Sequence, residues 1–342
     1  MNPDYPKFKI KELKLEEILS IGEEYGDMNN TFYILKDINI DNKGNIYTLD
    51  RGDLIIRIFD KNGNFKNTFG RSGQGPGEFI ELSRIFINSE GIIYIHDTGN
   101  TRVTRFSSEG KYIDDFKIGF DRKLIGIDEN NLYITNRLSW DTSTGKEERS
   151  FEKIDKNGEV LNTITTIEGQ NGTPNTISGG LWNTGYEHGA INYALRKNGD
   201  LVVGSSDKYM FSVYDKFGKL KFKFGRKYDP ISLTGSDRSR LTKDPEMQKL
   251  LPSKKPAFKI SYYRFMVDDE NNFWVMTFEK ENEGMTFDAF SEEGIYIRKV
   301  FFDFAYHKLT PILFNNGILY AIHIDEDGFN RVKGYKLHYI EP

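Results

Sequence analysis

The chain has 342 residues, a net charge of −4 and no cysteine. The absence of cysteine excludes disulfides, thiolate metal sites and a cysteine nucleophile, and the slightly acidic balance argues against a nucleic-acid partner or an anionic membrane surface. No apolar run approaches the roughly 20 residues that a membrane-spanning helix needs, so no transmembrane segment is expected. Residues Met1 to Asp4 do not begin a signal peptide, which leaves either a cytoplasmic protein or an exported one whose leader lies outside this sequence.

The first predicted elements are strands. Residues 15–22 end in a sequence that resembles NTFGRSGQG at 67–75, so they look like a fourth strand with no first three before it. Four strand-length pieces follow between residues 34 and 70: ILKDINID, NIYTLD, LIIRIFD and FKNTFG. Gly, Asn and Asp at their junctions favour tight hairpins. The first complete unit is therefore predicted to be a four-stranded antiparallel sheet.

This unit recurs along the chain. A first turn pattern appears as DNKGNIY (41–47), SEGIIY (89–94), DENNLY (128–133), RKNGDLV (196–202), DENNFW (269–274) and NNGILY (315–320), and a second as DKNG, SSEG, DKNG, DKFG and SEEG. The two turn glycines are 19 residues apart in three units: 44 to 63, 91 to 110 and 199 to 218. Six repeats of four short strands predict an all-β, six-bladed β-propeller. The last unit, ending at 332–340, has three strands, so the N-terminal strand should complete it and close the ring.

Unit two carries a specific resemblance. IYIHDTGNTRVTRF (93–106) is similar to the NHL repeat, and FGRSGQGPGEF (69–79) is similar to a connector of bacterial six-bladed propellers of that group. The match to Asn100 and Arg102 occurs in unit two only; unit one has Asp53 and Ile55 there. The chain thus resembles an NHL-repeat-like bacterial propeller family. That resemblance implies an extracytoplasmic location, with the cytoplasm as the alternative.

Residues 1–342 are expected to form a single propeller domain with two insertions, at about 167–190 and 232–258. The second should contain a helix that begins after Asp244, since Asp followed by Pro245 is a good helix start. Both insertions join a fourth strand to the next first strand. In a propeller such connectors lie on the same face as the loops between second and third strands, where function is usually placed. The glycine-rich stretch 70–77 lacks the residues of a phosphate loop and is interpreted as a crossover between blades. The basic run 219–227 is interpreted as a strand with a solvated face.

Aligning the units places two sets of polar residues at equivalent positions on that face. First strands begin near Asp37, Arg84, Lys123, Asn192, Arg264 and Thr310; second strands end near Asp50, Asp97, Asn136, Ser205, Thr277 and His323, flanked by Arg51, His96 and Arg137. The carboxylates of Asp50 and Asp97 have an alternative role, because Asp side chains often accept backbone N–H groups in turns. Turns explain the cations less easily. A carboxylate- or sulfate-bearing ligand, or an acidic peptide, would suit them.

The sequence therefore favours a binding module for a peptide, glycan or protein partner, with no cofactor and no nucleic acid. Its expected ligand-binding residues are Asp37, Arg84, Lys123, Arg137, Trp182, Asn192 and Arg264. Trp182 has loop packing as its alternative role. No GxSxG, HExxH or Ser/His/Asp arrangement appears, and whether the protein is an enzyme stays open. The alternative function is a metal-dependent, lactonase-like hydrolase or lyase with Ca²⁺ or Zn²⁺ held by Asp50, Asp97 and His323.

Overall fold

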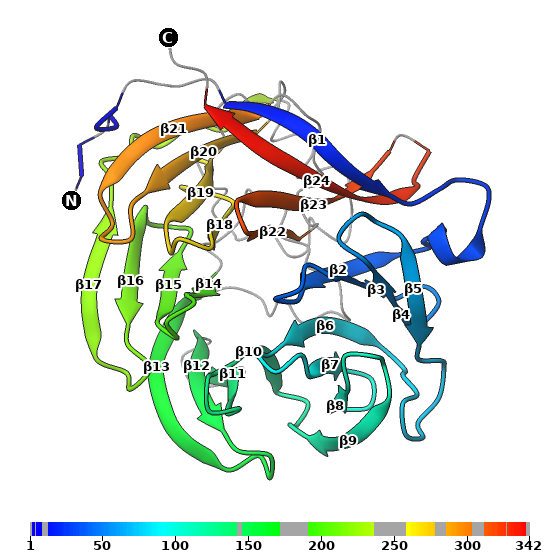
Figure 1. Cartoon of the computed structure of the whole chain (residues 1–342). Coiled ribbons are helices and arrows are strands. Elements are labelled where there is room, and N and C mark those ends of the chain that lie inside the picture. Colours follow the sequence, from blue (N-terminus) through cyan, green and yellow to red (C-terminus); the bar gives the residue numbers. More distant parts are fainter. Residues whose placement is uncertain are drawn as a thin grey trace.

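The structure is a computed structural model that describes residues 2–3, 5–8, 13–141, 146–171, 191–235, 258–277, 285–302, 311–325 and 327–339. Six four-stranded antiparallel sheets are arranged in a ring, with the first strand of each sheet nearest the centre and the last at the rim (Figure 1). The predicted six-bladed all-β propeller is confirmed. We number the blades in chain order by their first strands.

The strands follow the predicted units. Blade one comprises β2 (Leu35–Ile40), β3 (Ile46–Asp50), β4 (Ile55–Phe59) and β5 (Phe65–Phe69), and blade two comprises β6 (Leu82–Ile87), β7 (Ile93–Asp97), β8 (Arg102–Phe106) and β9 (Tyr112–Lys117). Blade three comprises β10 (Arg122–Ile127), β11 (Tyr133–Asp141), β12 (Lys146–Ile154) and β13 (Val160–Asn171), and blade four comprises β14 (Ile191–Leu195), β15 (Leu201–Ser205), β16 (Met210–Tyr214) and β17 (Leu220–Gly225). Blade five comprises β18 (Arg264–Val267), β19 (Phe273–Thr277), β20 (Met285–Phe290) and β21 (Tyr296–Phe302), and blade six comprises β22 (Ile312–Asn315), β23 (Ile318–Ile324), β24 (Asn330–Tyr339) and β1 (Leu13–Ile21).

The N-terminal strand closes the ring as predicted. β1 pairs antiparallel with β24, from Leu13 opposite Tyr339 to Ile21 opposite Val332. The chain start makes further contacts that the repeat pattern does not predict: the backbone N–H of Lys7 donates to the carbonyl of Tyr296 at 3.0 Å, and the side chain of Asn2 donates to the carbonyl of Gly294 at 2.8 Å. The chain start therefore contacts both blade six and the rim of blade five. A short 3₁₀ helix, η1 (Met28–Asn30), lies on the way into blade one.

Apolar residues fill the spaces between neighbouring blades. Tyr47 and Leu49 of blade one pack with Leu82 and Ile85 of blade two in one buried cluster. Because both faces of an inner strand are covered, β3 and β7 are buried along their whole lengths. Such close-packed layers give the first strands fixed positions around the centre.

The two faces of the ring differ in their connections. We call the face with the turns between first and second and between third and fourth strands the turn face. The opposite face, where first strands begin and second strands end, is the mouth face. On the turn face most described turns are closed by a side chain of their own: Asp41 accepts from the backbone N–H of Lys43 and Asn45 at 2.9 and 2.8 Å, and Asp60 does the same for Asn62 and Asn64. Turn glycines such as Gly44, with φ of 84°, supply the left-handed conformation.

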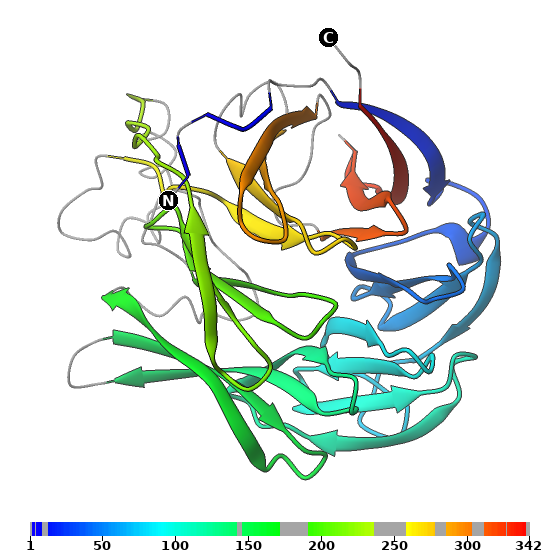
Figure 2. The same cartoon turned by 60° about the vertical axis from the view of Figure 1, so that its left-hand side comes forward.

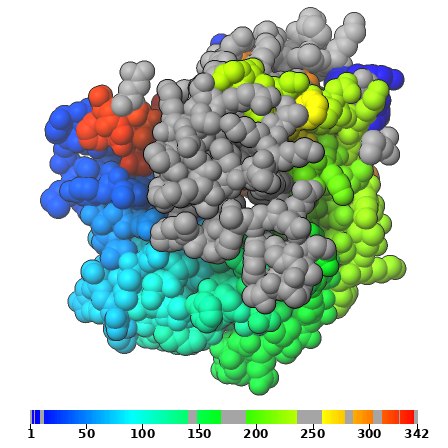
Figure 3. Space-filling view, turned by 180° about the vertical axis from the view of Figure 1, so that it is seen from behind, coloured from blue at the N-terminus to red at the C-terminus, as the bar shows by residue number. Residues whose placement is uncertain are grey.

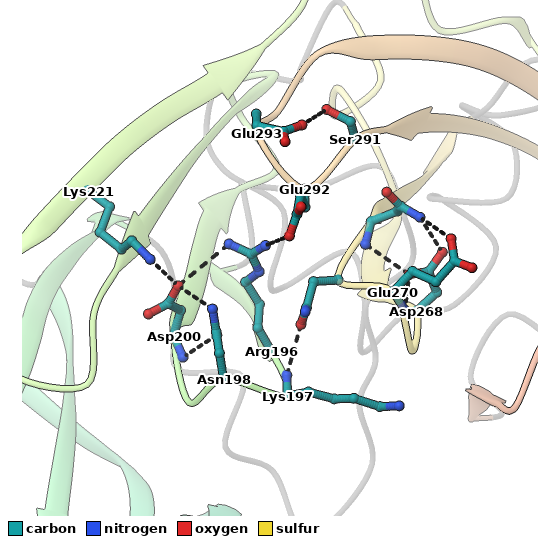
Figure 4. A network of polar contacts seen from close by, with 12 residues as sticks. Arg196, Lys197, Asn198, Asp200, Lys221, Asp268, Glu270, Ser291, Glu292 and Glu293 are labelled. Carbon is teal, nitrogen blue, oxygen red and sulfur yellow. Dashed lines mark hydrogen bonds and ion pairs between the residues drawn. The ribbon is translucent and has the colours of Figure 1, made fainter.

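Blade four departs from this turn pattern. Arg196 occupies the position that Asp41 has in blade one. Its guanidinium lies 3.5 Å from Asp200 of the same blade and 3.5 Å from Glu292 of blade five (Figure 4). Lys221 approaches the same Asp200 oxygen at 2.7 Å. These contacts join blades four and five across the turn face. The charges of Arg196, Asp200, Lys221 and Glu292 are thus paired with one another.

Three sequence-based expectations need correction or fall outside the description. The expected insertion at 167 begins inside β13, which runs to Asn171 and pairs with β12, and β12 pairs in turn with β11 as far as Asp141 (Figure 2). The repeat period does not predict these bounds, because β11, β12 and β13 are longer than the equivalent strands of blades one, two, four and five. The predicted helix after Asp244, and Trp182, lie outside the described residues. The ends of the second insertion do meet, as Ser232 bridges Phe258. Within the described residues no helix is long and apolar enough to cross a membrane.

Candidate functional site

Strand pairing places five of the six predicted first-strand residues at equivalent positions. Each lies opposite the next-to-last residue of the common second-strand core: Asp37 opposite Leu49, Arg84 opposite His96, Lys123 opposite Asn136, Asn192 opposite Gly204 and Arg264 opposite Met276. Thr310 lies outside the described residues. The alignment from turn spacing therefore finds the correct ring of positions on the mouth face.

Three cations gather at the centre of this face on blades one to three. The Arg84 side chain is 52% exposed, and its Nη1 forms an ion pair with Asp37 Oδ1 at 3.6 Å. Lys123 is exposed and Lys36 half-buried, and neither donates a hydrogen bond or forms an ion pair with any residue that the structure describes. Burial lowers the pKa of Lys36, and the charges of Arg51, Arg84 and Lys123 lower it further. The three cations thus repel one another across the blade boundaries.

Asp37 is the counter-charge of this cluster, but its carboxylate is only 5% exposed and accepts the backbone N–H of Ile85 at 3.1 Å. Burial raises the pKa of Asp37, and the charge of Arg84 opposes that rise. Among the described residues, one carboxylate for three cations leaves an excess of positive charge. Asp37 is therefore placed to orient Arg84, and the excess charge is available to an anion.

The second predicted ring is built into the backbone. The Asp50 carboxylate accepts from the backbone N–H of Tyr33, Ile34 and Gly52, each at 2.9 Å, and from Arg57 at 3.1 Å. Asp97 has the same arrangement in blade two, accepting from Ile80, Glu81, Gly99 and Asn100. Both carboxylates are fully buried. They anchor the connector that enters each blade to the loop that leaves its second strand.

The NHL-like motif of blade two acts in the same region. The Asn100 side chain donates to Asp97 at 2.6 Å and to the carbonyl of Gly73 at 3.1 Å. The Arg102 guanidinium donates to the carbonyls of Gly75 and Glu78, both at 2.8 Å. The glycine-rich connector is thus tied to its blade by carbonyl contacts, which supports its interpretation as a crossover.

Two buried polar groups line the cation cluster. His96 is 1% exposed and Asn136 3% exposed, and His96 Nδ1 and Asn136 Oδ1 have no hydrogen-bond partner among the described residues. Burial, aided by the charge of Lys123, lowers the pKa of His96 to about 4. His96 is therefore a neutral imidazole at physiological pH. It adds no positive charge to the cations above it.

The remaining predicted residues have other neighbours than the three cations. In blade three the position equivalent to Asp50 is Arg137 and not Asn136, because Arg137 lies opposite Arg122 at the start of β10. The Arg137 guanidinium pairs with Asp121 at 2.7 Å. Asn192 lies beside the buried hydroxyl of Tyr262, and Arg264 is half-buried on blade five. His323 contacts the hydroxyl of Tyr335 at 3.0 Å. Among the described residues no three His, Asp or Glu side chains are grouped as metal ligands, so Asp50, Asp97 and His323 do not form such a group there.

Lys36 is the site residue that sequence reasoning missed. It occupies the irregular position between Leu35 and Asp37, where the pairing with β3 shifts by one residue. An alignment by turn spacing cannot locate that shift, so the neighbouring Asp37 was placed in the ring and Lys36 was passed over. The positive neighbours of Lys36 become visible only when blades one to three are assembled.

Six four-stranded sheets arranged in a ring make this protein a six-bladed β-propeller. A family model described as "6-bladed beta-propeller" matches residues 26–194, which span blades one to three and the start of blade four. A curated relative, "Protein brain tumor" from Drosophila melanogaster, is 26% identical over 113 residues, which are 32% of this chain and 11% of that protein. The chain therefore matches only a small part of that relative.

Two solved structures from Bacteroides share the fold. A Bacteroides fragilis protein named "Putative exported protein" superposes with a TM-score of 0.62 at 12% identity, over 98% of this chain and 99% of that one. A member of the DUF4221 family from Bacteroides vulgatus gives a TM-score of 0.56 at 13% identity, over 96% and 99%. At such identity the likeness concerns the fold. The propeller part of the sequence resemblance is confirmed, and the NHL designation stays a prediction.

Proposed function

We propose that this protein is a non-enzymatic binding module that holds an anionic group of a peptide, glycan or protein partner at the centre of the mouth face. The observation that carries the proposal is the cluster of Lys36, Arg84 and Lys123, which has one buried carboxylate for three cations. Holding like charges together costs free energy, and a bound carboxylate or sulfate would offset that cost. The turn-face lysines Lys43, Lys61 and Lys111 are exposed, so solvent screens their charges, whereas Lys36 is half-buried beside Arg84 and Lys123.

The test is a binding titration by fluorescence anisotropy with two labelled probes, polyglutamate and a sulfated oligosaccharide. Wild type is compared with the triple variant Lys36→Gln/Arg84→Gln/Lys123→Gln. The control, Lys43→Gln/Lys61→Gln/Lys111→Gln, removes the same charge from exposed turn-face lysines. We expect at least one probe to bind wild type and the control alike and to lose tenfold or more with the first variant. Equal binding by all three proteins, or none, would contradict the proposal.

The alternative is a metal-dependent hydrolase or lyase. Among the described residues no group of His, Asp or Glu side chains supports it. The oxygens of Asp50 and Asp97 are occupied by backbone N–H groups, and a bound metal would have to displace them. Elemental analysis of the purified protein tests this directly. About one divalent ion per chain, lost in Asp50→Ala, would favour the metal-dependent enzyme over the binding module.

An extracytoplasmic location is part of the proposal. It rests on the resemblance of blade two and its connector to bacterial propellers. Fractionation of the source cells, with immunodetection of the native protein, tests it. Recovery in the cytoplasmic fraction alone would contradict it.

A further inference from the structure

Large apolar side chains are exposed where the chain enters blades one to three on the mouth face. Tyr33 is 63% exposed, Ile34 55%, Ile80 43% and Phe120 92%. The described part of this face is seen in Figure 3, with blade one in blue and blade two in cyan. Exposed apolar residues that are grouped on one face of a soluble protein mark an interaction site more often than scattered ones do.

These side chains are held outward by the fold itself. The backbone N–H groups of Tyr33 and Ile34 are fixed by Asp50, and that of Ile80 by Asp97. A Cβ added at Gly52 would come within 2.6 Å of the Tyr33 Cβ, and one at Gly99 within 2.5 Å of the Ile80 side chain. The two glycines let the connectors lie flat on the loops below. The backbone that carries the apolar groups of blades one and two is thus preorganised, which lowers the entropy cost of binding.

Each apolar residue is followed closely by a cation. Ile34 is two residues before Lys36, Ile80 is four before Arg84, and Phe120 is three before Lys123. Because all three first strands begin on the mouth face, the same order repeats on adjacent blades: an exposed apolar group at the strand entry, and a cation at the strand itself. The cluster of Lys36, Arg84 and Lys123 therefore lies beside an apolar set made of Ile34, Ile80 and Phe120.

We propose that this part of the mouth face binds an acidic peptide segment of a partner protein that carries aromatic or aliphatic residues among its carboxylates. The inference rests on the proposed function and names its ligand class. Carboxylates would pair with the three cations, and apolar side chains would cover Ile34, Ile80 and Phe120. A sulfated glycan suits the cations equally, but it offers mainly hydroxyl groups to aliphatic side chains that cannot hydrogen-bond. Charge and apolar surface together favour the peptide.

The experiment is affinity selection from a random peptide display library on three immobilised proteins. They are wild type, the mouth-face variant Ile34→Ser/Ile80→Ser/Phe120→Ser, and the turn-face control Val160→Ser/Phe217→Ser/Ile295→Ser. The control removes one exposed Phe and two exposed aliphatic residues from the turn face. Thermal unfolding checks that each variant is folded.

We expect wild type and the control to enrich peptides that combine Asp or Glu with Phe, Trp, Leu or Ile. A synthetic copy of the most enriched peptide should bind the mouth-face variant about tenfold more weakly or worse. Serine analogues of its apolar residues should weaken binding to wild type to a similar degree.

Other outcomes separate the two proposals. Enrichment of acidic peptides without apolar residues, bound equally by all three proteins, would overturn this inference and leave the anion site intact. Apolar peptides without carboxylates would contradict the anion site itself. No enrichment, with the sulfated oligosaccharide or anionic phosphatidylglycerol vesicles binding instead, would overturn the peptide as ligand. No enrichment and no binding of any anionic probe would overturn both proposals.

Discussion

The turn face and the mouth face of this propeller use the same kinds of residue for different ends. On the turn face, Asp41 and Asp60 close their own turns, and Arg196 links two blades through Asp200 and Glu292. On the mouth face, Asp50 and Asp97 anchor the backbone in a similar way, yet Lys36 and Lys123 find no anion among the described residues. The comparison teaches that charge alone does not mark a site. The mark is a group of like charges that the fold holds together with few counter-charges among the described residues.

The largest expected effect comes from the mouth-face anchor. Asp50→Ala should lower the free energy of unfolding by about 3–5 kcal/mol, because it leaves Arg57 buried without that partner and three backbone N–H groups without their acceptor. Denaturant unfolding measures the change. Added EDTA should leave the difference between wild type and variant unchanged. A loss below about 1 kcal/mol would show that Asp50 is not a structural anchor.

The second effect depends on pH. The pKa of His96 is lowered to about 4 in the folded protein from about 6.5 when unfolded, so the unfolded state binds more protons between these values. Stability is complete above about pH 6.5 and falls as the pH drops toward 4, by at most about 3 kcal/mol for this group. His96→Leu, which copies Leu49 of blade one, should flatten that slope. Unfolding curves between pH 7.5 and 4.5 test this, and an unchanged slope would contradict it.

A smaller loss is expected from the turn-face counterpart in the same blade. Asp41→Ala removes an acceptor of the Lys43 and Asn45 backbone N–H groups and of the Tyr47 hydroxyl, at 3.1 Å. No buried cation is left behind, so the expected cost is about 1–2 kcal/mol. The same denaturant assay gives the ratio to Asp50→Ala. Equal losses would remove the distinction between the two faces.

The smallest effect sharpens the comparison most. Phe120→Ser should change the free energy of unfolding by no more than about 0.5 kcal/mol, because the side chain is 92% exposed. Phe120 would then serve binding and not folding. A loss of 2 kcal/mol or more in thermal unfolding would place Phe120 in the packing of the protein and weaken its role in peptide recognition.

Sequence reasoning predicted the fold, and it predicted the strand positions of several residues of the candidate site. Turn glycines at fixed spacing mark the blades, so Asp37, Arg84 and Lys123 could be assigned to equivalent positions from the sequence alone. The solvent exposure of the Ile34, Ile80 and Phe120 side chains could not be predicted, since apolar residues are expected in the core. Lys36 was missed because strand irregularities do not appear in a repeat period. The long hairpin of blade three was missed because strand length is not set by turn spacing.

The central claim is that uncompensated cations on the mouth face hold an anion. Anisotropy titration of polyglutamate and the sulfated oligosaccharide at low and physiological salt tests it most directly, with wild type, the Lys36/Arg84/Lys123 variant and the Lys43/Lys61/Lys111 control. The account predicts salt-sensitive binding of at least one probe by wild type and control, lost in the mouth-face variant alone. Binding that is equal in the mouth-face variant and the control, or absent for both probes in wild type, would contradict it.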